Sequence, residues 1–129
     1  MTRTPDEVVT EFCGLWSKPD VDQIIGFFTE DAVYHNIPMA PATGRQAIRE
    51  LIDTVILRGI DAIDFHVHRQ ITQGSGESGL VMNERTDVMQ RTGGGQIELP
   101  VMGVFEVRDG RIALWRDYFD LATVTAAFT

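Results

Sequence analysis

The spacing of apolar residues changes once along the chain, near Gly59, and this change restricts the fold more than any other feature. Before Gly59, apolar side chains such as Phe12 and Trp16 recur three or four residues apart, which is typical of amphipathic helices. After it, apolar residues such as Phe65 and Val67 alternate with polar ones, as in half-buried strands. Helices followed by antiparallel strands predict an α+β fold, with the helices packed on one face of a curved sheet.

Start and stop signals divide the chain into individual elements. Thr4 to Glu7 forms a capping-box motif with Pro5 at the first helical position, and Asp109–Gly110 is typical of a type I′ hairpin turn. Helices are predicted over residues 5–17, 20–28 and 43–59, with a closing helical turn at 121–127, and strands over 31–36, 63–68, 80–90, 97–107 and 111–120. No linker or repeat separates them, so residues 1–129 are expected to form one domain.

The composition argues against several functional classes. The chain has a net charge of −8, and an acidic surface repels phosphate backbones and anionic lipids, so neither nucleic acid nor a membrane is an expected partner. The single cysteine, Cys13, excludes an internal disulfide and a cysteine-based metal cluster, and we expect it in the core. No apolar run is long enough to cross a bilayer, and the polar N-terminal residues do not resemble a signal peptide, so a cytoplasmic protein is expected.

Charged residues lie on strand faces that should be apolar. Side chains two residues apart share a face, so Arg85 and Asp87 are neighbours between Val81 and Met89 on one side of the strand 80–90. In the last strand, Asp117 shares a face with Trp115 and Phe119. A buried carboxylate needs a partner, and Arg85 is the best candidate through a bidentate pairing. The alternatives are a purely structural ion pair and a register in which these faces point outward.

Other polar residues give weaker signals. Tyr34 and Asn36 share a face of the early strand, and His35 points the other way. His66 and His68 lie beside Asp64 and Gln70 on the polar face of their strand, where solvent exposure is expected. Three histidines at these spacings do not predict a metal site.

Several of these segments together resemble the limonene-1,2-epoxide hydrolase family. They are Asn83–Val88 (NERTDV), Leu99–Phe105 (LPVMGVF) and Trp115–Leu121 (WRDYFDL), with Tyr34–Pro38 similar to the family's Tyr-x-Asn-x-Pro segment. The match covers nearly the whole chain in the right order. Thr86 stands where an apolar β-branched residue is more usual, but it points to the opposite face. The resemblance implies the cone of nuclear-transport-factor-2-like and SnoaL-like proteins, a curved, mainly antiparallel mixed sheet with helices on its concave face.

The resemblance also implies an Asp-Arg-Asp site made of Asp87, Arg85 and Asp117, with Tyr34 and Asn36 holding a water. Asp117 would be the base, Asp87 the acid that protonates the epoxide oxygen, and Arg85 the bridge. Two ionised carboxylates beside one arginine carry net charge −1, so in a dry pocket one carboxyl is expected to have a raised pKa. The resemblance implies a homodimer, no metal and no organic cofactor.

The expected partners are water and a small apolar epoxide, which would yield a vicinal diol. The residues expected to bind the substrate are Met89, Leu99, Val101, Trp115 and Phe119 from the strands, with Trp16 and Val55 capping the mouth from the helices. One alternative is a SnoaL-like isomerase or cyclase, whose lone aspartate base would not need Arg85 between two carboxylates. Another is a module that binds an apolar ligand without catalysis.

Overall fold

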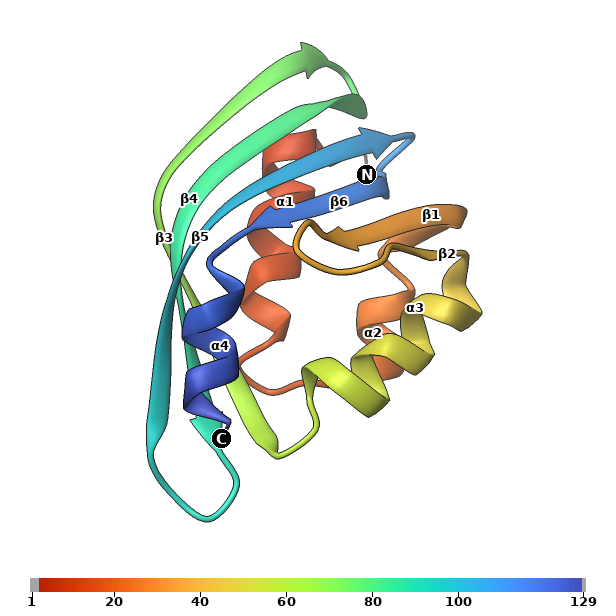
Figure 1. The fold of residues 1–129 in the computed structure, drawn as a ribbon. Helices are drawn as coiled ribbons and strands as arrows, with labels where there is room; N and C mark the ends of the chain where they lie inside the picture. Colours follow the sequence, from red (N-terminus) through yellow and green to blue (C-terminus); the bar gives the residue numbers. More distant parts are fainter. Residues whose placement is uncertain (1–2, 129) are drawn as a thin grey trace.

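The computed structural model describes residues 3–128, in which helices cover the concave side of one curved sheet (Figure 1). The helical elements are α1 (Pro5–Leu15), α2 (Val21–Ile25), α3 (Arg45–Leu51), a π-helical turn η1 (Ile52–Ile56) and α4 (Leu121–Ala127). The strands are β1 (Phe28–Asn36), β2 (Ala42–Thr43), β3 (Ile60–Ser75), β4 (Ser78–Arg91), β5 (Gln96–Arg108) and β6 (Arg111–Tyr118). No helix among the described residues is long and apolar enough to span a bilayer.

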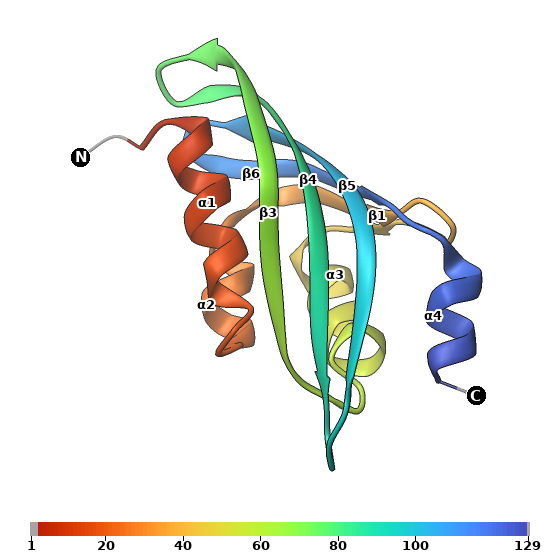
Figure 2. The same ribbon diagram turned by 90° about the vertical axis from the view of Figure 1, so that its left-hand side faces the viewer.

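The six strands form a single sheet in the order β2-β1-β6-β5-β4-β3. β1 runs parallel to β6 and the other neighbours are antiparallel, so the sheet is mixed but mainly antiparallel, as predicted. The long strands β3 to β5 bend around α1 (Figure 1), which packs against β3, β4, β5 and β6 and lies beside β3 in Figure 2. The α+β prediction is therefore confirmed, with the helices inside the curve of the sheet.

Local signals in the sequence account for several ends and turns. The Thr4 side chain accepts a hydrogen bond from the Glu7 amide while the Glu7 carboxylate accepts one from the Thr4 amide, so the predicted capping box is present. Asp109 and Gly110 have φ values of 51° and 80°, as a type I′ turn requires. Between the helices and the sheet, the ring of Phe12 packs edge-on against neighbouring aromatic rings at the centre of the core.

Several predicted boundaries were wrong. The second helix ends at Ile25, and Phe28 begins β1, because the chain turns at Gly26 and buries Phe28 in the sheet. Thr43 belongs to β2, and the third helix widens into η1 instead of running regularly to Gly59. The last strand stops at Tyr118, and the Asp120 side chain caps α4.

A β-bulge in β3 changes the side of the sheet that the residues after it face, and one predicted face is wrong for this reason. The pairing of β3 with β4 shifts between Val67 and Arg69, so Gln70 lies opposite Asn83 on the helix-facing side. The prediction that Gln70 shares a face with His66 and His68 is therefore wrong. A one-residue bulge reverses which side every later side chain faces.

Candidate active site

Arg85 is the centre of a buried polar cluster on the concave face of the sheet. The alternation of β4 buries every second residue from Val81 to Met89, and the Arg85 side chain is 0% exposed. Its Nε donates to Asp87 Oδ1 at 2.9 Å, and its Nη2 donates to Asp87 Oδ2 at 2.9 Å and Asp117 Oδ2 at 2.8 Å. Its Nη1 donates to Asp117 Oδ1 at 3.2 Å and Asn83 Oδ1 at 2.9 Å. The five hydrogen bonds match the five N–H groups of a guanidinium.

Gly103 lets Arg85 reach Asp117, because β5 lies between the strands that carry these two residues. Gly103 pairs with Asn83 on one side and Asp117 on the other. A Cβ on Gly103 would overlap Arg85 Nη1 and would lie 2.9 Å from both Asn83 Oδ1 and Asp117 Oδ1. The sequence reasoning missed Gly103 and Asn83 as site residues. A glycine inside an otherwise alternating strand was the signal for such a close approach.

Two aromatic side chains contact the polar cluster, Phe65 at Arg85 and Trp115 at Asp117. The Arg85 guanidinium lies 4.6 Å from the centroid of the Phe65 ring, a cation–π contact. The Trp115 indole N–H donates to Asp117 Oδ1 at 2.7 Å, and its ring stacks on Tyr34 at 4.2 Å. Trp115 was predicted only as a lining residue, and its hydrogen bond to Asp117 was missed.

The two carboxylates share one cation in a buried setting. Burial raises the pKa of Asp87 above its usual range, the bonds and charge of Arg85 partly oppose this rise, and the charge of Asp117 adds to it. Burial opposes the charge on Arg85, but Asp117 and Asp87 raise its pKa well above the usual value, so it remains a guanidinium. Burial and the nearby Asp117 charge also raise the pKa of Tyr34, which keeps its phenol protonated.

A cavity lies over this cluster, and the space between its lining atoms, including the open solvent at its mouth, is about 750 Å³. Asp87, Asp117, Tyr34 and Asn36 line it, while Arg85 lies behind them. The structure brings all seven predicted lining residues to its wall: Trp16, Val55, Met89, Leu99, Val101, Trp115 and Phe119. Val55, 50% exposed, is at the mouth.

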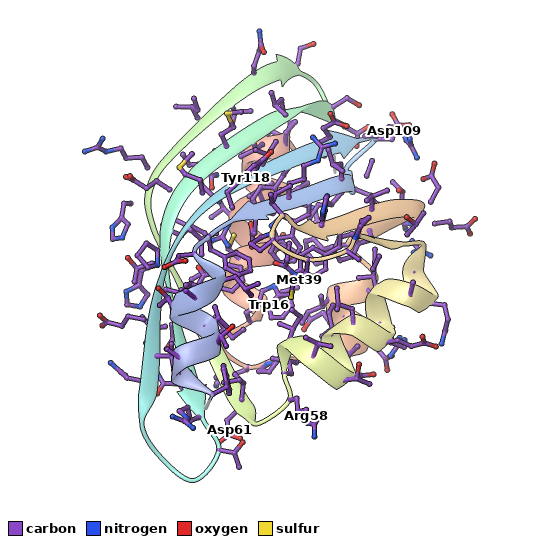
Figure 3. The ribbon with its side chains drawn as sticks, viewed as in Figure 1. Trp16, Met39, Arg58, Asp61, Asp109 and Tyr118 are labelled. Carbon is purple, nitrogen blue, oxygen red and sulfur yellow. The ribbon has the colours of Figure 1, made fainter. Side chains whose placement is uncertain are left out.

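Several further wall residues were missed by the sequence reasoning. They are Met39, Ile56, Ile63, Phe65, Leu121, Val124 and Phe128, and three of them come from α4 or the residue after it. In Figure 3 the labels of Trp16 and Met39 lie near the centre of the view, between the sheet and the helices, whereas Asp61 and Asp109 lie at the periphery; Trp16 is buried and Met39 is half-buried. The apolar residues of α4 gave no periodic signal strong enough to assign them to a cavity wall.

A chain of hydrogen bonds connects Arg85 to the surface of α1. Asn83 accepts from Arg85 and donates through Nδ2 to Gln70 Oε1 at 3.1 Å. Gln70 Nε2 in turn donates to Asp6 Oδ1 at 2.8 Å and Thr10 Oγ1 at 3.0 Å. The β3 bulge that turns Gln70 inward therefore supports the side of Arg85 that faces away from Asp87.

The remaining candidate residues lie outside the cluster. His66 and His68 are exposed, and His35 contacts the Met39 carbonyl oxygen at 3.0 Å. Cys13 is in the core, as predicted, and burial raises the pKa of its thiol to about 12. Within residues 3–128, no group of three His, Cys, Asp or Glu side chains is placed to hold a metal ion.

The geometry suits paired proton transfer. Two carboxyl groups on opposite sides of one arginine face the same cavity, and one of them has a raised pKa. Such a pair can hold one proton donor and one proton acceptor at the same pH.

Comparisons with known proteins show the family of the chain. Residues 4–129 match the family model described as the limonene-1,2-epoxide hydrolase catalytic domain. The chain is 33% identical over 113 residues to the epoxide hydrolase EphG of Mycobacterium tuberculosis, covering 88% of this chain and 71% of that protein.

Solved structures extend the comparison. The structure of an M. tuberculosis LEH-like epoxide hydrolase superposes with a TM-score of 0.72 at 31% identity, covering 92% of this chain and 84% of the other. A SnoaL-like polyketide cyclase from Shewanella putrefaciens gives a TM-score of 0.80 at 15% identity, covering 96% and 86%. The second likeness shows the fold alone.

Proposed function

The chain belongs to the limonene-1,2-epoxide hydrolase family, and from that premise we propose that it adds water to a small, largely apolar epoxide in one step, giving a vicinal diol. In this proposal Asp117 is the general base, Asp87 the general acid and Arg85 the bridge between them. The observation that carries it is the saturated guanidinium of Arg85, which fixes two carboxyl groups at the wall of one apolar cavity.

The hydrogen bonds favour this division of roles. Asp117 accepts two bonds from Arg85 and a third from Trp115, which suits an ionised carboxylate. The raised pKa of Asp87 suits a carboxylic acid that keeps its proton until the epoxide oxygen needs it. The site then contains one negative carboxylate and one positive guanidinium.

Asn36 and Tyr34 are the proposed water-holding groups. Asn36 pairs with Asp117 across β1 and β6, and its buried Nδ2 has no hydrogen-bond partner among the described residues. A water bonded to that amide lies next to the proposed base.

As water attacks an epoxide carbon, Asp117 takes its proton, the C–O bond breaks, and Asp87 gives its proton to the departing oxygen. Proton return from Asp117 to Asp87 through the Arg85 bridge completes the cycle.

The test is a single turnover in ¹⁸O-labelled water with protein in excess over epoxide. We expect labelled diol and unchanged protein mass, because the carboxyl groups move only protons. Asp117→Asn should lose the reaction, whereas Asp64→Asn, which changes a carboxylate on the opposite face of β3, should retain it. Label in a peptide containing Asp87 or Asp117, with unlabelled diol, would establish a covalent route instead. Absence of any turnover across an epoxide panel would contradict the hydrolase proposal itself.

The homodimer implied by the family resemblance stays a prediction. Sedimentation of the purified protein would test it, with a monomer at assay concentration as the contradicting result.

A further inference from the structure

Trp16 is a buried hydrogen-bond donor with no acceptor. It is 0% exposed and lines the cavity, yet its indole Nε1 has no hydrogen-bond partner among residues 3–128. Buried polar groups in native proteins are nearly always paired, and an unpaired one is costly. The feature therefore needs an explanation that the proposed acid–base chemistry does not provide.

The Phe65 ring contacts both Trp16 and the Arg85 guanidinium. The centroid of the Phe65 ring lies 4.6 Å from the Arg85 guanidinium carbon and 5.5 Å from the centroid of the Trp16 ring. The Trp16 and Phe65 rings are nearly parallel, 13° apart. The Trp16 N–H makes no hydrogen bond to Asp87 or Asp117, so it is a donor separate from those that Arg85 and Trp115 give to the carboxyl pair.

The other tryptophan of the cavity makes a useful contrast. Trp115 lies 5.8 Å from Trp16 between ring centroids, and its own N–H is fully used by Asp117. An indole in this cavity wall can therefore have a hydrogen-bonded N–H, as Trp115 does. A phenylalanine at position 16 would have kept the stacking on Phe65 without the cost of an unpaired donor.

We propose that the Trp16 N–H binds the substrate, and that the substrate is an epoxide with a second oxygen acceptor, such as a carbonyl, across its ring from the epoxide. This inference rests on the proposed function and adds a specificity-determining residue to it. The acceptor would be held at the Trp16 end of the cavity while the epoxide faces Asp87 and Asp117. The rest of the wall is largely apolar, which suits a hydrocarbon ring between the two polar ends.

The test uses two nearly isosteric probes, 4-acetylcyclohexene oxide and 4-isopropenylcyclohexene oxide, which differ in C=O against C=CH₂. The measured quantity is the ratio of their kcat/KM values, acetyl over isopropenyl. Trp16→Phe should lower this ratio at least about fivefold relative to the wild type, the usual scale of one neutral hydrogen bond. Ile56→Val also alters the cavity wall but removes no donor, so it should leave the ratio within about twofold.

An unchanged ratio in Trp16→Phe would overturn the inference, since packing alone would then explain Trp16. Should that variant not fold, the wild-type ratio decides. If the carbonyl is hydrogen-bonded in the cavity, the kcat/KM of the acetyl compound should be at least as high as that of the isopropenyl compound. A carbonyl left unpaired in the cavity would make the kcat/KM of the acetyl compound about tenfold lower or more. If the wild type hydrolyses neither these probes nor any other epoxide of the panel, the proposed function fails. The ratio of Kd values for the same probes, measured by calorimetry on wild type and Trp16→Phe, then tests the Trp16 donor separately.

Discussion

Replacing Gly103 with alanine adds one methyl group at the crowded centre of the site. The new Cβ would overlap Arg85 Nη1 and press on the Asn83 and Asp117 oxygens that Nη1 contacts. The φ of Gly103 is outside the left-handed region that favours glycine, so the effect of the substitution is steric. The guanidinium must move, because strand backbones surround the methyl on both sides.

The size of the effect follows from the two bonds at Nη1. Hydrogen bonds to charged groups each contribute about 1.5–3 kcal/mol, so losing both predicts a loss of about 3–6 kcal/mol in the free energy of unfolding. A domain of this size has only about 5–15 kcal/mol in total. A displacement near 1 Å in a positioned catalytic group costs roughly a hundredfold in rate, so kcat/KM should fall at least that far.

Urea unfolding and epoxide hydration should be measured on the same preparations. Gly14→Ala is the matched control, because Gly14 lies in α1, nothing lies within 4 Å of its added Cβ, and alanine there should stabilise the helix by roughly 0.5–1 kcal/mol. A Gly103→Ala protein with the stability and kcat/KM of the wild type would refute the idea that β5 needs a glycine for Arg85 to pass.

Three further predictions concern the carboxyl pair. Asp117→Asn keeps the size of the side chain but removes the proton acceptor, so kcat should fall at least about a hundredfold with an unchanged far-UV spectrum; near-normal turnover would remove Asp117 from the mechanism. Arg85→Lys keeps the charge but loses the planar fork, so kcat should fall severely, and a normal rate would mean that charge alone suffices. Because Asp87 must carry a proton and its pKa is raised, kcat/KM should fall as the pH rises through that raised pKa. A pH–rate profile with no decline on its alkaline side, while the protein stays folded, would assign the acid role elsewhere.

The two strands that carry the carboxyl groups could be predicted from the sequence because their signal is strong. Alternation in a strand is strict, so a charged residue on an apolar face stands out, and Arg85, Asp87 and Asp117 were each found in this way. The structure places all three on the concave face and pairs them. Burial of a charge without a partner is too costly to occur by accident, which is why the pairing was also expected.

What the sequence did not predict depends on contacts between distant segments. The β3 bulge that turns Gln70 toward Asn83 has no residue signature, and it shows only in the shifted pairing with β4. The widening of the third helix into η1 over Ile52–Ile56 likewise gave no signal in the spacing of the apolar residues. Gly103 had a visible signal, but its meaning required knowing that Arg85 crosses β5 at that point.

The distribution of hydrogen bonds separates the groups that build the site from those that meet the reactants. Arg85 uses all five of its donors within the protein, so it can fix Asp87 and Asp117 but has none free for an epoxide. Among the described residues, the buried side-chain atoms without a partner are Asn36 Nδ2 and Trp16 Nε1, and both residues line the cavity. Asn36 pairs with Asp117 across β1 and β6, whereas Trp16 stacks on Phe65. We therefore propose that saturated donors set the geometry of the acid and the base, and that the two unpaired donors bind the reactants: Asn36 the water and Trp16 a second oxygen of the substrate.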